Sequence, residues 1–190
     1  MKIFGDSISG NCLKVKWTAD YLGLPYEWIE TNVLKGESRT PQFLAMNPAG
    51  QVPTVILDDG RPLAQSNAII THLAEDSDLI PDDAYERAQM FQWMFWEQYS
   101  HEPAIAVARF ARVYRGVEPD PKVMVNGVAA LNLMDKTLHQ RSWFAGERVS
   151  LADIALVAYT RLAHEGGFDL KAYPAIRGWI SMVESAVGID

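Results

Sequence analysis

The stretch SISGNC, residues 7 to 12, brings together side chains that can act on an anion or a sulfur atom. Two hydroxyls, Ser7 and Ser9, precede Cys12, the only cysteine of the chain. A short apolar run lies before the stretch and an amphipathic one after it, which predicts a strand-to-helix turn. The first N–H groups of a helix are unpaired and carry partial positive charge, so this turn is a candidate anion site.

Simpler roles are open for the same residues. Ser9 has the residue type of a helix N-cap, a role worth about 1 kcal/mol. Cys12 falls in the first helical turn and faces an apolar helix, where a cysteine is commonly a small core residue. With one cysteine, the chain has no internal disulfide and no multi-thiolate zinc site.

A second candidate is NPAGQVPT, residues 47 to 54, in which Val52-Pro53 stands at the entrance to a predicted strand. Proline removes a ladder donor and is tolerated only at a strand's first position or on an edge. A cis Val52-Pro53 bond would direct the Val52 N–H and C=O outward, where they could pair with an extended, peptide-like ligand. The alternative is an ordinary trans proline in a loop.

A third candidate is QSNAI, residues 65 to 69, where we expect a helix to begin with Ser66 as its N-cap. The Ser66 hydroxyl and the neighbouring N–H groups suit a carboxylate. The alternative is a cap with no ligand.

Composition narrows the function. The chain has 190 residues, 48% of them hydrophobic, a net charge of -7 and a pI near 5.1. This acidity argues against nucleic acid or anionic membrane as a partner. Nothing resembles a signal peptide or a membrane span, so we expect a protein of the reducing cytoplasm. The histidines share no metal-ligand spacing, so no metal is expected.

The elements that must position these residues fall into two parts. Residues 1–75 predict strand, helix, strand, short helix, an Asp-Gly hairpin and a helix. The polar, proline-bearing residues 76–83 suit a linker. Residues 84–190 predict an all-helical domain, with helices over 84–115, 121–140, 150–164 and 173–186.

In this combination the chain resembles the cytosolic glutathione transferase superfamily from end to end. The element order, NPAGQVPTV and QSNAI carry the resemblance, together with VSLADI, residues 149 to 154. That last segment fits the capping box that opens a buried helix in this superfamily, with Ser150 and Asp153 as its partners. The resemblance implies a thioredoxin-like α/β domain over 1–75 that binds glutathione, followed by an all-α domain that forms the electrophile pocket.

The resemblance also answers what a Ser-x-x-Cys does at the first turn. Thioredoxin-like redox proteins carry a thiolate nucleophile where this chain has Ser9. Serine-type glutathione transferases look like this: the enzyme supplies a hydroxyl and a helix N-terminus, and the co-substrate glutathione brings the sulfur. Ser7 is the competing donor, and the spacing to Cys12 favours Ser9.

Further site residues are implied in the same way. The Val52 backbone, next to Pro53, would pair with the cysteinyl unit, and Gln51 would contact the tripeptide. Ser66 would hold the γ-glutamyl carboxylate, whereas Gln65 replaces the glutamate of many members and is a weaker partner for the ammonium group. Lys35 and Arg39 are the cations for the glycyl carboxylate, or else belong to a solvated surface.

In the helical domain, the resemblance assigns Tyr99, Arg109 and Tyr114 to the pocket for a small hydrophobic electrophile. It also implies a homodimer in which the N-terminal domain packs against the partner's C-terminal domain. Two other functions are open. One is a glutathione-dependent disulfide reductase or peroxidase in which Cys12 forms a mixed disulfide. The other is a non-catalytic binding module that keeps the fold.

Overall fold

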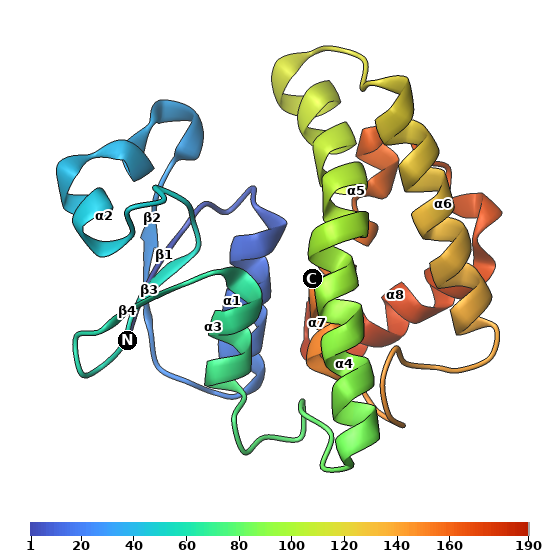
Figure 1. Ribbon diagram of the computed structural model, residues 1–190, viewed down its shortest axis with the longest axis horizontal. Helices are drawn as coiled ribbons and strands as arrows, with labels where there is room; N and C mark the ends of the chain where they lie inside the picture. Colours follow the sequence, from blue (N-terminus) through green and yellow to red (C-terminus); the bar gives the residue numbers. More distant parts are fainter. Residues whose placement is uncertain (190) are drawn as a thin grey trace. The chain divides into compact units, whose positions relative to one another are not determined.

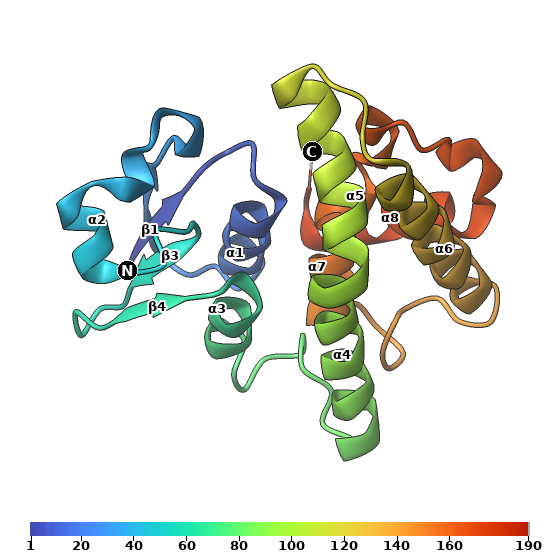
Figure 2. The same ribbon diagram turned by 45° about the horizontal axis from the view of Figure 1, so that its top comes forward.

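The computed structural model describes residues 1–189 and divides into two compact units, Met1–Ser77 and the chain from Asp78 onward. The first unit is a four-stranded sheet with helices on both faces (Figure 1). Helices α1 and α3 cover one face of the sheet and α2 lies on the other, as both ribbon views show (Figure 2). Its elements are β1 (Lys2–Gly5), α1 (Gly10–Tyr21), β2 (Glu27–Glu30), α2 (Pro41–Met46), β3 (Thr54–Ile56), β4 (Pro62–Ala64) and α3 (Ser66–Leu73).

The register of the sheet decides which strand ends lie side by side. The strand order is β2-β1-β3-β4, with β1 and β2 parallel and the other two pairs antiparallel. Thr54 pairs with Phe4 on one side and with Ala64 on the other. The entrance to β3, the exit of β1 and the exit of β4 therefore lie at one edge of the sheet. Gly5 pairs with Glu30, so β2 ends at the same edge.

The second unit is built from helices. Its elements are α4 (Ala84–Trp96), α5 (Glu102–Arg109), α6 (Pro121–Leu138), α7 (Leu151–Thr160) and α8 (Pro174–Val187), with π-helical turns at Glu97–His101 and Phe110–Tyr114. The helix predicted over 84–115 is therefore a rod interrupted twice, visible from α4 through α5 in Figure 1. Pro103 gives a reason for the first interruption, because proline lacks the N–H that a regular helix needs there.

Helix α7 forms the core of this unit, since all ten of its residues are buried. It opens with the predicted capping box between Ser150 and Asp153. The Asp153 carboxylate also accepts the Phe144 N–H (3.0 Å) and the Trp179 indole N–H (2.9 Å), which ties α7 to α8. Burial raises the pKa of Asp153, against these donors. Both the thioredoxin-like and the all-helical architectures are thus confirmed.

One expected cap is wrong. Ser66 is the first residue of α3, and the N-cap is Gln65, which makes no side-chain cap bond. Gln65 has φ 72° and ψ 112°, outside the helical region, and the helix begins at Ser66, one residue earlier than a Ser66 N-cap would give.

Candidate functional site

The β1–α1 turn presents Ser9 as the N-cap of α1. Ser9 is extended, its N–H donates to the Asp6 carbonyl (2.9 Å), and its own carbonyl accepts the Cys12 and Leu13 N–H groups (3.0 Å each). The Ser9 side chain makes no cap bond to the helix backbone. Its hydroxyl bonds with the Cys12 thiol instead. The serine and the cysteine of the Ser-x-x-Cys therefore contact each other.

Cys12 is inside the protein, with none of its surface exposed. Burial raises the pKa of the Cys12 thiol to about 11, although hydrogen bonds from the Asp6 backbone and from Ser9 oppose the rise. The negative charges of Asp6 and Glu30 add to it. A buried thiol that stays protonated is a poor nucleophile, so the geometry favours the core role for Cys12.

Ser7, the competing hydroxyl, is occupied. Its backbone N–H and its hydroxyl both donate to Glu30 Oε1, at 3.0 and 3.1 Å. The Trp28 indole N–H donates to the other oxygen of Glu30 (2.8 Å), and these donors lower the pKa of Glu30, the Ser7 N–H most and the indole next. A hydroxyl that donates to a carboxylate has no second proton for a thiolate, which favours Ser9.

The loop before β3 is organised by Asn47, which is buried. Its Nδ2 donates to the Gln51 carbonyl (2.9 Å) and to Thr54 Oγ1 (3.0 Å), while its Oδ1 accepts the Ala49 N–H (3.1 Å). Thr54 Oγ1 also donates to the Gln51 carbonyl (2.9 Å). These hydrogen bonds pair polar groups of the loop with one another.

Val52 is the exception within that loop. The Val52-Pro53 peptide bond is cis, which is one of the two alternatives that the sequence left open. Within residues 1–189, neither the N–H nor the C=O of Val52 has a hydrogen-bond partner. An exposed peptide unit at a sheet edge is what an extended ligand needs for strand-like pairing.

Ser66 joins the same edge from α3. Its hydroxyl donates to Asn11 Oδ1 (3.1 Å), an acceptor on the first turn of α1 that also receives Lys14 Nζ (2.8 Å). The N-termini of α1 and α3 are therefore adjacent, and both direct their first N–H groups toward this edge. Two such termini suit a ligand with anionic groups at two points.

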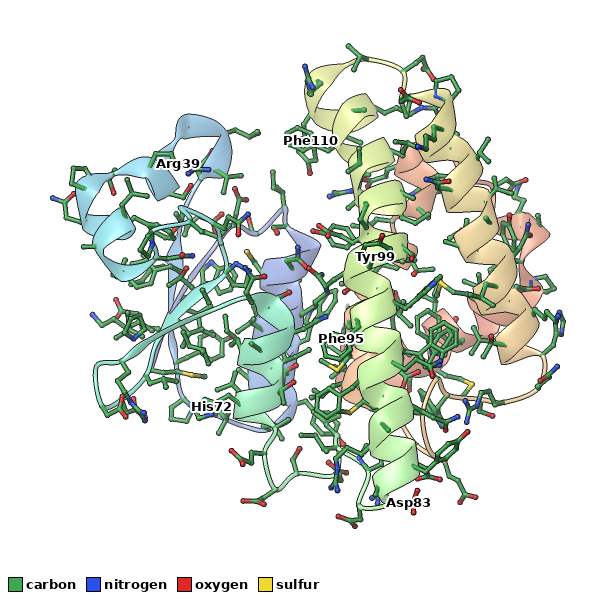
Figure 3. All side chains as sticks on the ribbon, in the orientation of Figure 1. Arg39, His72, Asp83, Phe95, Tyr99 and Phe110 are labelled. Atoms are coloured by element: carbon green, nitrogen blue, oxygen red, sulfur yellow. The ribbon has the colours of Figure 1, made fainter. Side chains whose placement is uncertain are left out.

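The two candidate cations differ. Arg39 Nη1 donates to the Ala49 carbonyl (3.0 Å), and the guanidinium lies so close to Gly50 that a Cβ there would be 2.6 Å from it. Arg39 therefore belongs to the Val52 loop, and Figure 3 shows it in the segment that leads into α2. The side chains of Lys35 and Gln51 are exposed.

Of the three candidates in the helical unit, the structure brings two together. Arg109 Nη2 donates to the Tyr114 hydroxyl (3.1 Å), and its Nε forms an ion pair with Glu165 (2.5 Å). Tyr99 is 87% exposed and lines a different hollow of about 490 Å³, with Leu133 of α6 on its far side. Figure 3 shows Phe95, Tyr99 and Phe110 succeeding one another along the α4–α5 rod.

Within residues 1–189, no cluster of three or more histidine, cysteine, aspartate or glutamate side chains could hold a metal ion. The same residues include no helix that is long and apolar enough to cross a membrane.

Sequence reasoning missed three residues of this site. Asn47 is the first residue of NPAGQVPT, and asparagine before a turn commonly binds the backbone beyond it, which is a signal that could have found it. Asn11 and Glu30 gave no signal, because their partners, Ser66 and Ser7, lie 55 and 23 residues away.

Family models for the glutathione S-transferase N-terminal and C-terminal domains match residues 8–76 and 118–186. The crystal structure of a glutathione S-transferase from Pseudomonas fluorescens Pf-5 is 47% identical, covers 97% of this chain and 94% of its own, and superposes with a TM-score of 0.93. The probable glutathione S-transferase GSTF2 of Oryza sativa subsp. japonica is 31% identical, over 94% of this chain and 89% of its own. The disulfide-bond oxidoreductase YfcG of Escherichia coli strain K12 is 28% identical, over 85% and 80%.

Proposed function

Because this chain belongs to the glutathione S-transferase family, we propose that it ionises the thiol of bound glutathione for attack on a small electrophile. The observation that carries the proposal is the sheet edge of the first unit. There the unpaired Val52 peptide, the Ser9 hydroxyl at the start of α1, and Ser66 at the start of α3 meet. An extended tripeptide with a central sulfur and terminal carboxylates has groups that match each of them.

The energies are sufficient. A thiol with a pKa of about 8.5 is about 3% ionised at pH 7, and lowering that pKa by about 2 requires about 2.7 kcal/mol. A hydrogen bond to a charged acceptor supplies about 1.5–3 kcal/mol, and a helix N-terminus about 0.3–1. Ser9 remains protonated, since it acts as a donor. In the free protein its hydroxyl bonds with the neutral Cys12 thiol, and it would exchange this bond for one to the charged glutathione sulfur.

The remaining contacts follow from an extended glutathione lying along this edge of the sheet. Val52 pairs through its backbone beside Pro53, and Ser66 exchanges its bond to Asn11 for the γ-glutamyl carboxylate. Arg39 receives the glycyl carboxylate, supported by its position against the Val52 loop.

Lys35 and Gln51 stay secondary contacts, because their side chains are exposed. Gln65 offers the ammonium group only a neutral amide. The proposal assigns glutathione to residues 1–75 and the electrophile to residues 84–190, with 76–83 as the linker.

For the electrophile we propose Arg109 and Tyr114, which contact each other. The exposure of Tyr99 on a separate hollow supports a role toward a partner instead, and we propose a homodimer. The acidic composition and single cysteine suit the cytoplasm.

The test begins with calorimetric titration of glutathione, followed by turnover with an aryl halide electrophile. Ser9→Ala should bind glutathione within about threefold of the wild type but raise the pKa of the bound thiol by about 1 to 2, because one charged hydrogen bond is lost. Ser7→Ala is the matched control and should keep that pKa within about 0.5. If Ser9→Ala leaves the pH–rate profile unchanged, the donor is another residue, and Ser7 is the first alternative.

Reduction of disulfides by glutathione is a second candidate, favoured by the likeness to YfcG. The burial of Cys12 opposes a mechanism in which that residue forms a mixed disulfide. A Cys12→Ser variant with full reductase activity would exclude Cys12 while leaving reduction by glutathione itself open. Binding of glutathione without either activity would instead indicate a binding module.

A further inference from the structure

Two carboxylates hold the turn that carries Ser9. The buried Asp6 accepts the Ile8 N–H (3.2 Å) with one oxygen and the Val33 N–H (2.9 Å) with the other. Glu30, on the edge strand β2, accepts both the N–H and the hydroxyl of Ser7. The turn is therefore fixed from the core side by Asp6 and from the exposed side by Glu30.

Glu30 is itself held in place. The Trp28 indole N–H donates to its second oxygen (2.8 Å). The Trp28 ring in turn packs on Gly5, where a Cβ would lie 2.4 Å from the ring. A glycine at the last position of β1 thus lets the indole reach Glu30, and Glu30 reaches the turn.

We propose that Glu30 is a positioning residue of the thiol site, whose carboxylate fixes the Ser9 turn while its negative charge opposes ionisation of a thiol at that turn. This inference rests on the proposed function. The two effects have opposite signs, because a fixed turn favours the Ser9 hydrogen bond, whereas a nearby negative charge disfavours a thiolate.

The same charge effect is expected at Cys12, the one thiol of the protein. Glu30 and Asp6 both contribute to raising the pKa of Cys12, which lies one turn into α1. Other charged groups also lie near the turn. On α1, the buried Lys14 donates through Nζ to Asn11 Oδ1 (2.8 Å). In the segment after β2, Glu37 accepts the Asn32 N–H (2.7 Å), and the Lys35 side chain is exposed. All of these groups stay the same in the Glu30 variants, so a difference between the variants reports on Glu30.

Two substitutions separate the effects. Glu30→Gln keeps an acceptor for Ser7 but removes the charge, and Glu30→Ala removes both. A unit charge about 10 Å away through mostly aqueous surroundings shifts a pKa by about 0.3. In Glu30→Gln we therefore expect the pKa of bound glutathione to fall by about 0.3, with about twofold more thiolate below that pKa. In Glu30→Ala we expect that pKa to rise and kcat to fall about fivefold or more.

Glu27→Gln is the matched control. Glu27 lies on the same strand, is exposed and pairs with Lys2 (3.3 Å), but it stands at the opposite end of β2. The Glu27→Gln substitution removes the same charge and should leave the pKa of bound glutathione unchanged. In about 0.5 M salt the difference between wild type and Glu30→Gln should shrink, because exposed charges are screened.

A second readout does not need glutathione. The pKa of Cys12, followed by thiolate absorbance as the pH is raised, should fall by about 0.3 in Glu30→Gln and stay unchanged in Glu27→Gln. Equal thiol pKa values in wild type and Glu30→Gln, at both glutathione and Cys12, would overturn the inference. If wild type binds no glutathione, the proposed function fails, while the Cys12 pKa values still decide the role of Glu30.

Discussion

At the scale of single residues, Ser9 and Cys12 depend on the rest of the chain in different ways. Position in a strand-to-helix turn is local, so the sequence shows that Ser9 begins a helix. The pKa of Cys12 depends on burial under the sheet and on the charges of Asp6 and Glu30, which the fold brings near. The spacing of residues along the chain does not show which charges lie near Cys12 or how far burial raises its pKa.

Cys12 gives the first residue-level prediction. With a pKa of about 11, its thiol is about 0.1% ionised at pH 8, against about a quarter for a free cysteine. We expect iodoacetamide to label it at least 100-fold more slowly than free cysteine, with a rate that rises about tenfold per pH unit until pH approaches 11. Mass spectrometry follows the labelling, and urea-unfolded protein is the control. Rapid labelling of the folded protein at pH 8 would contradict the assigned burial.

Gln65 gives the second residue-level prediction. Its φ of 72° is a conformation that residues with a Cβ rarely adopt, at a cost of about 1–3 kcal/mol. Gln65→Gly should therefore be more stable than Gln65→Ala by about 1 kcal/mol in urea unfolding, the reverse of the usual order. The control is Ala68→Gly, at an exposed position inside α3, which should lose about 1 kcal/mol. Equal stability of the two Gln65 variants would mean that the backbone there is unstrained.

At the scale of elements, hydrophobic periodicity and turn residues were enough to predict most of the helices and strands. The Asp-Gly hairpin and the capping box of α7 are set by neighbours within a few residues. The start of α3 was missed by one residue because Gln65, not Ser66, takes the special backbone conformation. The π-helical turns were missed because helical periodicity continues through them.

The Val52 loop gives the element-level prediction. Asn47→Ala removes three hydrogen bonds made by a buried side chain, so we expect a loss of about 2–3 kcal/mol in the free energy of unfolding. Glutathione affinity should fall at least tenfold, because the Val52 peptide is no longer held out for pairing. Urea unfolding and calorimetry measure the two effects.

The comparison variant for this loop is Gln51→Ala. The loop uses only the Gln51 carbonyl, and its side chain is exposed, so stability should change by less than about 0.5 kcal/mol. An Asn47→Ala variant that unfolds like wild type would show that Thr54 alone holds the loop.

At the scale of the whole molecule, the distribution of exposed apolar side chains is uneven. In the first unit, Leu34 is the one large hydrophobic residue among those described that is more than half exposed. The second unit exposes many, and several follow the α4–α5 rod and α6. They are Tyr85 (72%), Phe95 (71%), Tyr99 (87%), Val125 (67%), Val128 (44%) and Leu133 (42%).

Two of these side chains, Tyr99 and Leu133, line the hollow of about 490 Å³, together with Trp96 and Pro103. Aromatic residues are enriched at the centres of interfaces, and exposed apolar patches of this kind mark contacts with partners. The proposed homodimer gives the patch an occupant, a second copy of the chain.

The last prediction tests whether a second copy of the chain covers this patch. Sedimentation velocity should give a dimer for the wild type, and Tyr99→Glu or Leu133→Glu should shift it toward monomer by at least tenfold in Kd, because a charge would be buried in an apolar contact. Met182→Glu is the control: it adds the same charge at a partly exposed apolar residue that lines a different hollow, beside α8. Matching thermal unfolding of the three variants excludes misfolding as the cause. A monomeric wild type, or dimers that survive both substitutions, would remove this surface as the interface while leaving the sheet-edge site of the first unit unaffected.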